Sequence, residues 1–255
     1  MTFSETVAPD FKANLTLVCD SSQRAQAGEA FHKAALHARE VLDRLDPQNP
    51  MGEVFQLMSH NTKGTFSISP DLAQILNTSQ QVSLRLKEPL AKKLVVDIKN
   101  NEVTFKTDNI LINIEPLLKG YLADLIMQDL EKAGWSNNLL ETGGIYISRG
   151  RDFNGSWKIP VIDNTTATAH HAFFYKAGNI ASATVNQDEK GVASIPSDLK
   201  SVTVFTEEGA CRAQGMATAA FAAGFDNAKK ILKVAGAANH SVLIDQNGKF
   251  VRIPD

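Results

Sequence analysis

The sequence is poor in cysteine, and it has neither a long apolar run nor a cluster of like charges. It contains two cysteines among 255 residues, Cys19 and Cys211, which are too few for a disulfide framework or a zinc site. No apolar run approaches the roughly 20 residues that a membrane-spanning helix needs. Lys and Arg together number 26 and Asp and Glu 28, so the net charge is −2. Because the basic residues are not clustered, the sequence indicates no nucleic-acid-binding surface.

Familiar catalytic motifs are missing as well. No Walker A, GxGxxG, HExxH or GxSxG pattern occurs, and no Ser/His/Asp triad can be assigned. His32 and His37 lie on one expected helix at a poor spacing for a shared metal, and the pair His170-His171 is typical of a solvated turn. The N-terminal residues lack a basic stretch followed by an apolar one, so no secretory signal is expected.

The residues that are present are typical of one large α+β domain. An apolar fraction of 43% and a charged fraction of 21% are ordinary for a globular protein, and a chain of 255 residues can bury a substantial core. No internal repeat or flexible linker interrupts the sequence, so a single domain is expected over residues 1–255. The polar stretch from Asn186 to Ser201 is expected to be a surface loop.

Apolar periodicity and turn residues predict the individual elements. Ser69 and Pro70 have the residue types of a helix N-cap and first turn, Gly134 marks a helix end, and Asn100-Asn101 and Asn247-Gly248 mark hairpins. Strands are expected at 14–19, 94–99, 103–106, 110–114, 139–148, 157–162, 172–175, 180–184 and 202–206, and helices at about 25–45, from Pro70, 117–133, 213–223 and 227–234.

Gly143 and Gly144 form the one glycine pair that points toward ligand chemistry. Two adjacent glycines let the backbone approach a ligand such as a nucleotide or a pyrophosphate closely. The same pair is also typical of a bulge or of a close contact between two elements. Both interpretations stay open at this point.

Several segments, taken in order, resemble one known family. The most specific is INIEPLLKGYLADLIMQDLEKAGWSNNLLETGGIYISRG, which holds Lys119, Gly120, Tyr121 and Asp124 in a Lys-Gly-Tyr-x-x-Asp signature before the glycine pair. The others are LDRLDPQNPMGEVFQLM, ISPDLAQIL, SVTVFTEEGACRAQGMATAAFAAGF and SVLIDQNGKF. From about residue 40 to the C-terminus, with gaps, the chain is similar to the ApbE-type FAD:protein FMN transferases.

The resemblance implies a fold, a reaction and a set of site residues. The fold would be α+β, a single compact domain of mixed or antiparallel sheets covered by helices, in two lobes with a central cleft. The reaction would transfer FMN from FAD to a Thr or Ser of a target flavoprotein with the help of Mg²⁺. Such proteins occur in the periplasm, which would require that a signal had been removed.

The same resemblance assigns roles to individual residues. Asp124 would contact FAD, the charge of Lys119 could face a phosphate, and Tyr121 is a candidate wall for the isoalloxazine. The amides near Gly143 and Gly144 are candidate donors to the pyrophosphate. The alternatives are a surface lysine, a helix-capping aspartate and a tyrosine in ordinary core packing.

The metal position departs from the family pattern. Family members have an Asp four residues before a Thr, so that both face one metal ion from one side of a helix. This chain has Gln214 before Thr218, and a neutral amide replaces the carboxylate that Mg²⁺ favours. The family's GxFDPT and HxxDPxTG segments also have no counterpart, and its glycine turn reads Glu115-Pro116.

Two classes of function therefore remain, and a scaffold without a ligand is a third, less economical one because the Lys119–Asp124 segment is retained. One is a transferase that uses FAD and Mg²⁺ on a partner protein. The other is a relative that binds flavin, or a flavoprotein partner, and has lost transferase activity.

The departure at Gln214 predicts weak Mg²⁺ binding in the absence of FAD. Substituting Gln214→Asp should strengthen binding, because it restores an anionic oxygen ligand beside Thr218. Calorimetric titration of Mg²⁺ into both proteins, with and without FAD, measures the difference. Tight binding by the wild type that the substitution leaves unchanged would place the metal elsewhere, for example at Glu207 or Glu208.

Overall fold

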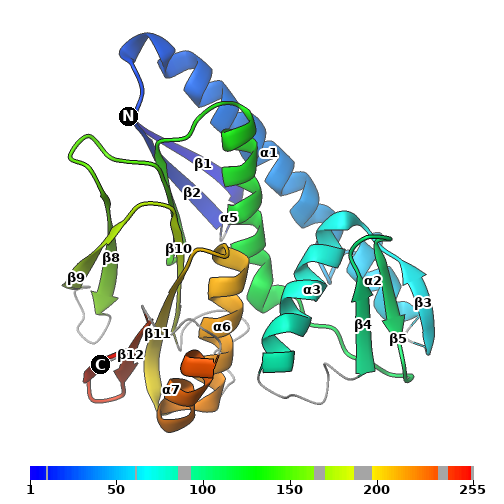
Figure 1. Ribbon diagram of the computed structural model, residues 1–255. Coiled ribbons are helices and arrows are strands. Elements are labelled where there is room, and N and C mark those ends of the chain that lie inside the picture. Colours follow the sequence, from blue (N-terminus) through cyan, green and yellow to red (C-terminus); the bar gives the residue numbers. More distant parts are fainter. Residues whose placement is uncertain are drawn as a thin grey trace.

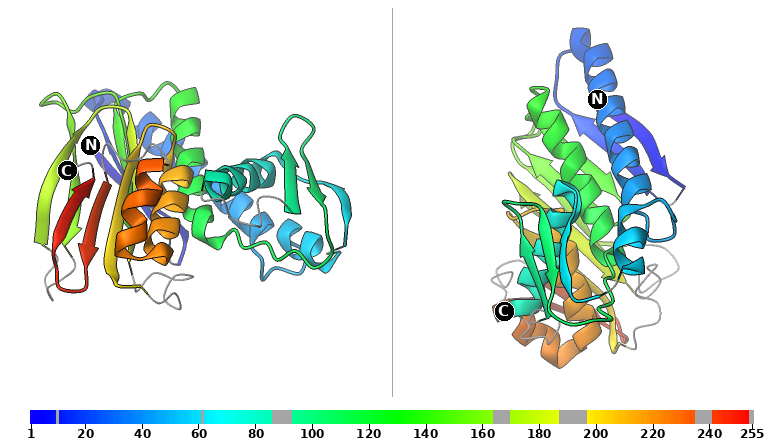
Figure 2. Two further views of the ribbon diagram at one scale, coloured as in Figure 1. Left: turned by 60° about the horizontal axis from the view of Figure 1, so that its bottom comes forward. Right: turned by 90° about the vertical axis from the view of Figure 1, so that its right-hand side faces the viewer.

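The computed structural model describes residues 1–9, 11–60, 62–85, 93–163, 170–186, 197–234 and 241–253. Its main lobe is built on an eight-stranded antiparallel sheet in the order β1-β2-β6-β7-β10-β11-β12-β13. A smaller lobe holds α2, α3 and a three-stranded sheet in the order β3-β5-β4 (Figures 1 and 2). The expected α+β class, with antiparallel sheets covered by helices, is confirmed.

The elements follow one another in this order. Their bounds are β1 Thr2–Ala8, β2 Phe11–Leu17, the short 3₁₀ helix Ser21–Gln23, α1 Arg24–Leu45, α2 Glu53–Ser59, β3 Gly64–Ser67, α3 Pro70–Arg85, β4 Leu94–Asp97, β5 Glu102–Phe105, α5 Glu115–Lys132, β6 Asn138–Thr142, β7 Ile145–Arg149, β8 Trp157–Asp163, β9 His170–Ala177, β10 Ile180–Asn186, β11 Leu199–Thr206, α6 Ala210–Ala223, α7 Phe225–Val234, β12 Ser241–Asp245 and β13 Phe250–Ile253.

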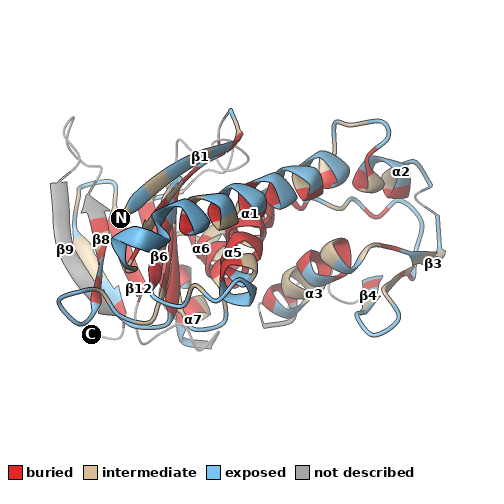
Figure 3. Cartoon of the chain, turned by 90° about the horizontal axis from the view of Figure 1, so that it is seen from above, coloured by how far each residue is buried: buried red, intermediate tan, exposed pale blue. Residues whose placement is uncertain are grey.

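Helices cover one face of the large sheet, and the hairpin β8–β9 covers part of the other (Figure 1). The helical face holds the larger apolar core, in which the buried stripe of α1 includes Phe31, Ala38 and Val41 (Figure 3). On the opposite face, Ile159 and Val161 of β8 pack with side chains of β7, β10, β11 and β12. Within the described residues, no helix is long and apolar enough to cross a membrane.

The local signals for caps and hairpins are mostly confirmed. Ser69 caps α3, because its Oγ accepts a hydrogen bond of 3.2 Å from the amide of Leu72. Gly134 ends α5 with a φ of 89°, and the closing hairpin turns at Asn247-Gly248. At the other hairpin β4 ends at Asp97, two residues earlier than expected, and β5 begins at Glu102, because the carboxylate of Asp97 accepts hydrogen bonds from the amides of Lys99 and Asn100 in the turn.

Two expected strands differ in the structure, the strands β1 and β3 were not expected, and His170-His171, expected in a turn, lies in β9. Residues 139–148 are two strands, because Gly143 and Gly144 adopt φ values of 50° and 85° and turn the chain into a hairpin. Residues 110–114 form no strand, although Ile110 and Ile114 are buried as the chain returns from the small lobe. The first sheet strand, β1, was not expected, because its TFSETVA pattern buries little at the sheet edge. Of the expected polar loop 186–201, residues 187–196 lie outside the described residues.

Helices α5 and α6 approach each other closely at Gly120. A Cβ atom on Gly120 would lie 2.6 Å from the carbonyl oxygen of Ala210 and 2.8 Å from the Cα of Cys211. Both neighbours are backbone atoms and cannot move aside cheaply. The glycine of the Lys-Gly-Tyr signature is therefore required by helix packing.

Gly120→Ala should destabilise the protein by about 1–3 kcal/mol, since the overlap outweighs the gain in helix propensity. Urea unfolding measures the change in the free energy of unfolding. Gly178→Ala is the matched control, because a Cβ there meets nothing within 4 Å. Equal stability of the two variants would contradict the close approach.

Candidate functional site

The candidate site is built around the contact between α5 and α6. Helix α5 lies between α1 and α6, and α6 also packs on β7, β10, β11 and α3. This arrangement brings the signature segment of α5 against the Ala-rich segment of α6, although about ninety residues separate them in the sequence. We refer to the contact as the α5–α6 seam; its residues are Leu117, Gly120 and Asp124 on α5 and Ala210, Cys211, Gln214 and Gly215 on α6.

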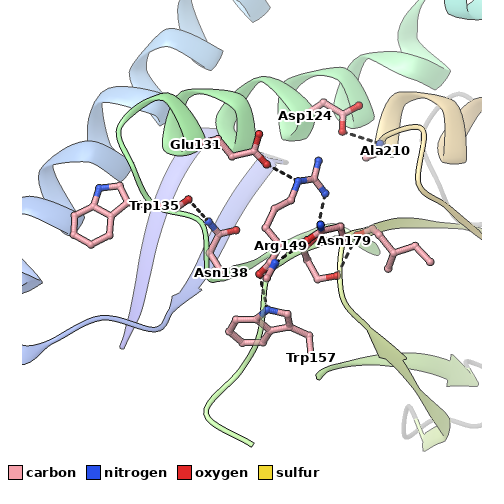
Figure 4. A network of polar contacts seen from close by, with 11 residues as sticks. Asp124, Glu131, Trp135, Asn138, Arg149, Trp157, Asn179 and Ala210 are labelled. Carbon is pink, nitrogen blue, oxygen red and sulfur yellow. Dashed lines mark hydrogen bonds and ion pairs between the residues drawn. The ribbon is translucent and has the colours of Figure 1, made fainter. Parts of the chain in front are cut away.

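Asp124 caps the N-terminus of α6. Its two carboxylate oxygens accept hydrogen bonds from the amides of Ala210, at 2.7 Å, and Cys211, at 2.9 Å; Figure 4 draws the bond to Ala210. Gly209 precedes the helix with a φ of 105°, and a Cβ there would lie 2.8 Å from Asp124 Oδ2. The structure thus assigns Asp124 the capping role that the sequence left open; contact with FAD stays a prediction.

The environment of Asp124 disfavours its charged form. Burial raises the pKa of its carboxyl to about 6, although the amides of Cys211 and Ala210 and the charge of Arg149 act in the opposite direction. Arg149 lies on β7, where it also pairs with Glu131 of α5 (Figure 4). The cap is therefore a carboxyl group that can take up a proton near neutral pH.

Gln214 is turned into the seam. Its Oε1 accepts a hydrogen bond of 2.7 Å from the amide of Gly120, and the residue is only 3% exposed. Thr218 lies one helical turn further on α6, and its buried Oγ1 has no hydrogen-bond partner among the described residues. Gln214 and Thr218, the predicted metal pair, therefore offer one engaged amide oxygen and one hydroxyl.

These residues do not fit a Mg²⁺ site of the family kind. Mg²⁺ prefers carboxylate ligands and gives up its water reluctantly, and the described residues contain no group of three or more His, Cys, Asp or Glu that could hold a metal. Glu208 does not compensate, because its carboxylate pairs at 3.0 Å with Arg212, which also donates to Gln81 of α3.

Tyr121 is tied to the small lobe. Its hydroxyl donates a hydrogen bond of 2.6 Å to Asp71, in the first turn of α3, and Asp71 also pairs with Arg44 near the end of α1. Burial and the neighbouring Asp71 raise the pKa of Tyr121 well above its usual range. The hydroxyl is thus a fixed donor that links the two lobes, and the role of the ring as a flavin wall stays a prediction.

Lys119 lies away from the α5–α6 seam, in a hollow beside α1. It lines a space of about 320 Å³ between the end of α1, the tip of the β1–β2 hairpin and the start of α5. Successive helical residues point about 100° apart, so Lys119 faces α1 while Gly120 faces α6. The structure therefore does not bring the Lys119 side chain to the seam.

Gly143 and Gly144 form the tight turn between β6 and β7. The carbonyl of Gly144 accepts a hydrogen bond of 3.0 Å from the amide of Thr184 in β10, the strand against which α6 packs. A Cβ on Gly143 would meet nothing within 4 Å, and the residue is exposed, so there is free space beside the turn. Binding of a pyrophosphate there stays a prediction.

Sequence reasoning missed two buried groups at the start of α6. Arg212 is 6% exposed, and its charge stands out in the otherwise small and apolar ACRAQGMATAAF segment, which could have been noticed. Cys211 is 5% exposed, and burial raises the pKa of its thiol well above its usual range. No sequence signal identified Asp71, whose role depends on contacts with two distant helices.

Comparisons with known proteins identify the family and agree with the fold. A family model described as the ApbE family matches residues 85–240. The structure is similar to the flavin transferase ApbE from Vibrio cholerae, with a TM-score of 0.73 and 16% identity over 98% of this chain and 95% of that one. It is also similar to the apo flavinyl transferase ApbE of Pseudomonas stutzeri, with a TM-score of 0.81 and 14% identity over 100% and 95%. The ApbE protein from Thermotoga maritima gives a TM-score of 0.75 and 16% identity over 100% and 97%. No curated protein sequence matches the chain.

The raised pKa of Asp124 predicts a pH dependence of stability. The unfolded carboxyl titrates near 3.8 and the folded one at about 6, so the folded state holds the proton more tightly. The stabilisation is complete below about pH 4 and is lost as the pH rises to about 6, by at most about 3 kcal/mol. Urea unfolding across this range should show the trend in the wild type and in Glu40→Gln, an exposed control. If Asp124→Asn retains the full trend, another group is responsible.

Proposed function

Because the chain belongs to the ApbE family, we propose that it is a flavin transferase that attaches FMN from FAD to a Thr or Ser hydroxyl of a target flavoprotein. In this reaction the hydroxyl oxygen bonds to the phosphorus of the FMN half, the bond to the AMP half breaks, and the hydroxyl proton is released. The observation that carries the proposal is the α5–α6 seam, which joins the signature residues Gly120 and Asp124 to the segment around Gln214.

The proposed binding residues have distinct tasks. The turn at Gly143 and Gly144, which has open space beside Gly143, would donate backbone amides to the FAD pyrophosphate. Tyr121, fixed by its bond to Asp71, would border the isoalloxazine. Asp124 would act by holding the start of α6 in place, and Lys119 would act from the opposite side of α5 only by attracting the negatively charged nucleotide over a distance.

A second candidate function is a flavin-binding relative that does not transfer FMN. The position of Gln214 favours it, because an amide that is hydrogen-bonded to Gly120 cannot neutralise the charge that develops on the leaving phosphate. Such a protein would bind FAD, or a flavoprotein partner, as an accessory or carrier. The two candidates differ in one measurable event, the formation of a covalent FMN–protein bond.

Binding of FAD to the protein should quench fluorescence. The titration should saturate at tens of micromolar FAD or below, which corresponds to a binding free energy of about −6 kcal/mol or better. FMN transfer is measured by the in-gel flavin fluorescence and the mass of the target, a flavoprotein domain with an acceptor Thr. The control target is the same domain without that Thr. We expect slow transfer by the wild type. Gln214→Asp with Mg²⁺ should be faster by about tenfold, or 1.4 kcal/mol of barrier.

The outcomes separate the candidates. FAD binding without transfer by either protein would establish the second candidate. If FAD shows no saturable binding, both candidates are wrong and the chain is a scaffold that has kept the fold alone.

A further inference from the structure

We propose that Gln214 replaces a metal-binding group with a hydrogen bond between helices, so that the α5–α6 seam closes without a divalent cation. The proposal concerns the same region as the proposed function, but it does not depend on FMN transfer. It accounts for the disagreement between the family's metal dependence and the residues that this chain provides.

The seam is continuous along the two antiparallel helices. At one end Leu117 lies over Gly215, where a Cβ would come within 2.7 Å of Leu117 Cδ2. In the middle Gln214 reaches the amide of Gly120 at 2.7 Å. At the other end Asp124 caps the first amides of α6. At each of these three positions the two helices are therefore joined directly, by side-chain packing or by hydrogen bonds.

The length and neutrality of glutamine suit this place. Its amide oxygen is one methylene further from the backbone than an aspartate carboxylate, and that reach brings it to the amide of Gly120. The residue is 3% exposed, and a buried carboxylate without a counter-charge would be costly, whereas a neutral amide needs only a hydrogen-bond partner. A Gln at position 214 removes the negative charge that a cation would otherwise have to balance.

The acids of the region are committed elsewhere. Asp124 accepts from Ala210 and Cys211, and Glu208 pairs with Arg212 on the side of α6 that faces Gln81. Among the described residues, Asp124 is the one carboxylate that we find in the seam, and its oxygens point at backbone amides. The seam thus provides no charged oxygen for Mg²⁺.

Thermal unfolding in EDTA and in millimolar MgCl₂, without flavin, tests the proposal on the full chain. The wild type should unfold at the same temperature in both buffers, to within about 1 °C. Gln214→Met keeps the length of the side chain and removes the acceptor, so its Tm should be lower by about 2–8 °C in both buffers. Gln26→Met, on the exposed side of α1, is the matched control and should shift Tm by less than about 1 °C.

Each outcome decides the proposal. It is overturned if MgCl₂ raises the Tm of the wild type by several degrees and Gln214→Met loses that rise, because the cation then binds through Gln214. It is also overturned if Gln214→Met has the same Tm as the wild type, because the hydrogen bond then does not stabilise the contact between the helices. A rise that both proteins share shows that the cation binds without Gln214, which supports the proposal that this residue serves the bond between the helices. Because no flavin is present, failure here is distinct from failure to bind or transfer FMN.

Discussion

Gly120 has no side chain, and the backbone of α6 occupies the place where one would be. That close approach is the constraint on which the candidate site depends. It lets Gln214 reach the amide of Gly120 and lets Asp124, one turn along α5, cap α6. Because α6 also packs on β10, which bonds to the Gly143-Gly144 turn, the same contact fixes the glycine turn relative to the helices. A change at Gly120 would therefore disturb both the Gln214 bond and the Asp124 cap.

The fold agrees with that of known flavin transferases, but the polar side chains of the seam do not provide the family's metal site. Similarity over nearly the whole length of known flavin transferases shows that the scaffold is retained, whereas the polar groups in the seam are used for packing. The side-chain oxygens of Asp124 and Gln214 accept hydrogen bonds from backbone amides. The nucleotide contacts proposed above are the backbone at Gly143 and the aromatic ring of Tyr121. Recognition of a flavin by such groups needs no metal, which is why binding and transfer have to be tested separately.

Much of the fold could be predicted from the sequence because its signals are local. The stripe of α1, the cap at Ser69 and the stop at Gly134 each depend on neighbouring residues. The site could be predicted only in part. Helical periodicity already places Lys119 and Gly120 on different sides of α5, but the partner of Asp124 lies 86 residues away. A long-range hydrogen bond leaves no periodic signal, so neither the cap nor the Gln214–Gly120 bond could be derived without the structure.

The central claim is that the hydrogen bond between Gln214 and Gly120 joins α5 to α6 at the place where the family would bind a cation. A crystal structure of the wild-type protein grown with FAD and MgCl₂ tests it most directly. The account predicts that Gln214 Oε1 stays within hydrogen-bonding distance of the Gly120 amide and that no cation lies between Gln214 and Thr218. A Mg²⁺ ion coordinated by Gln214 Oε1 and Thr218 Oγ1, with the bond to Gly120 broken, would contradict it.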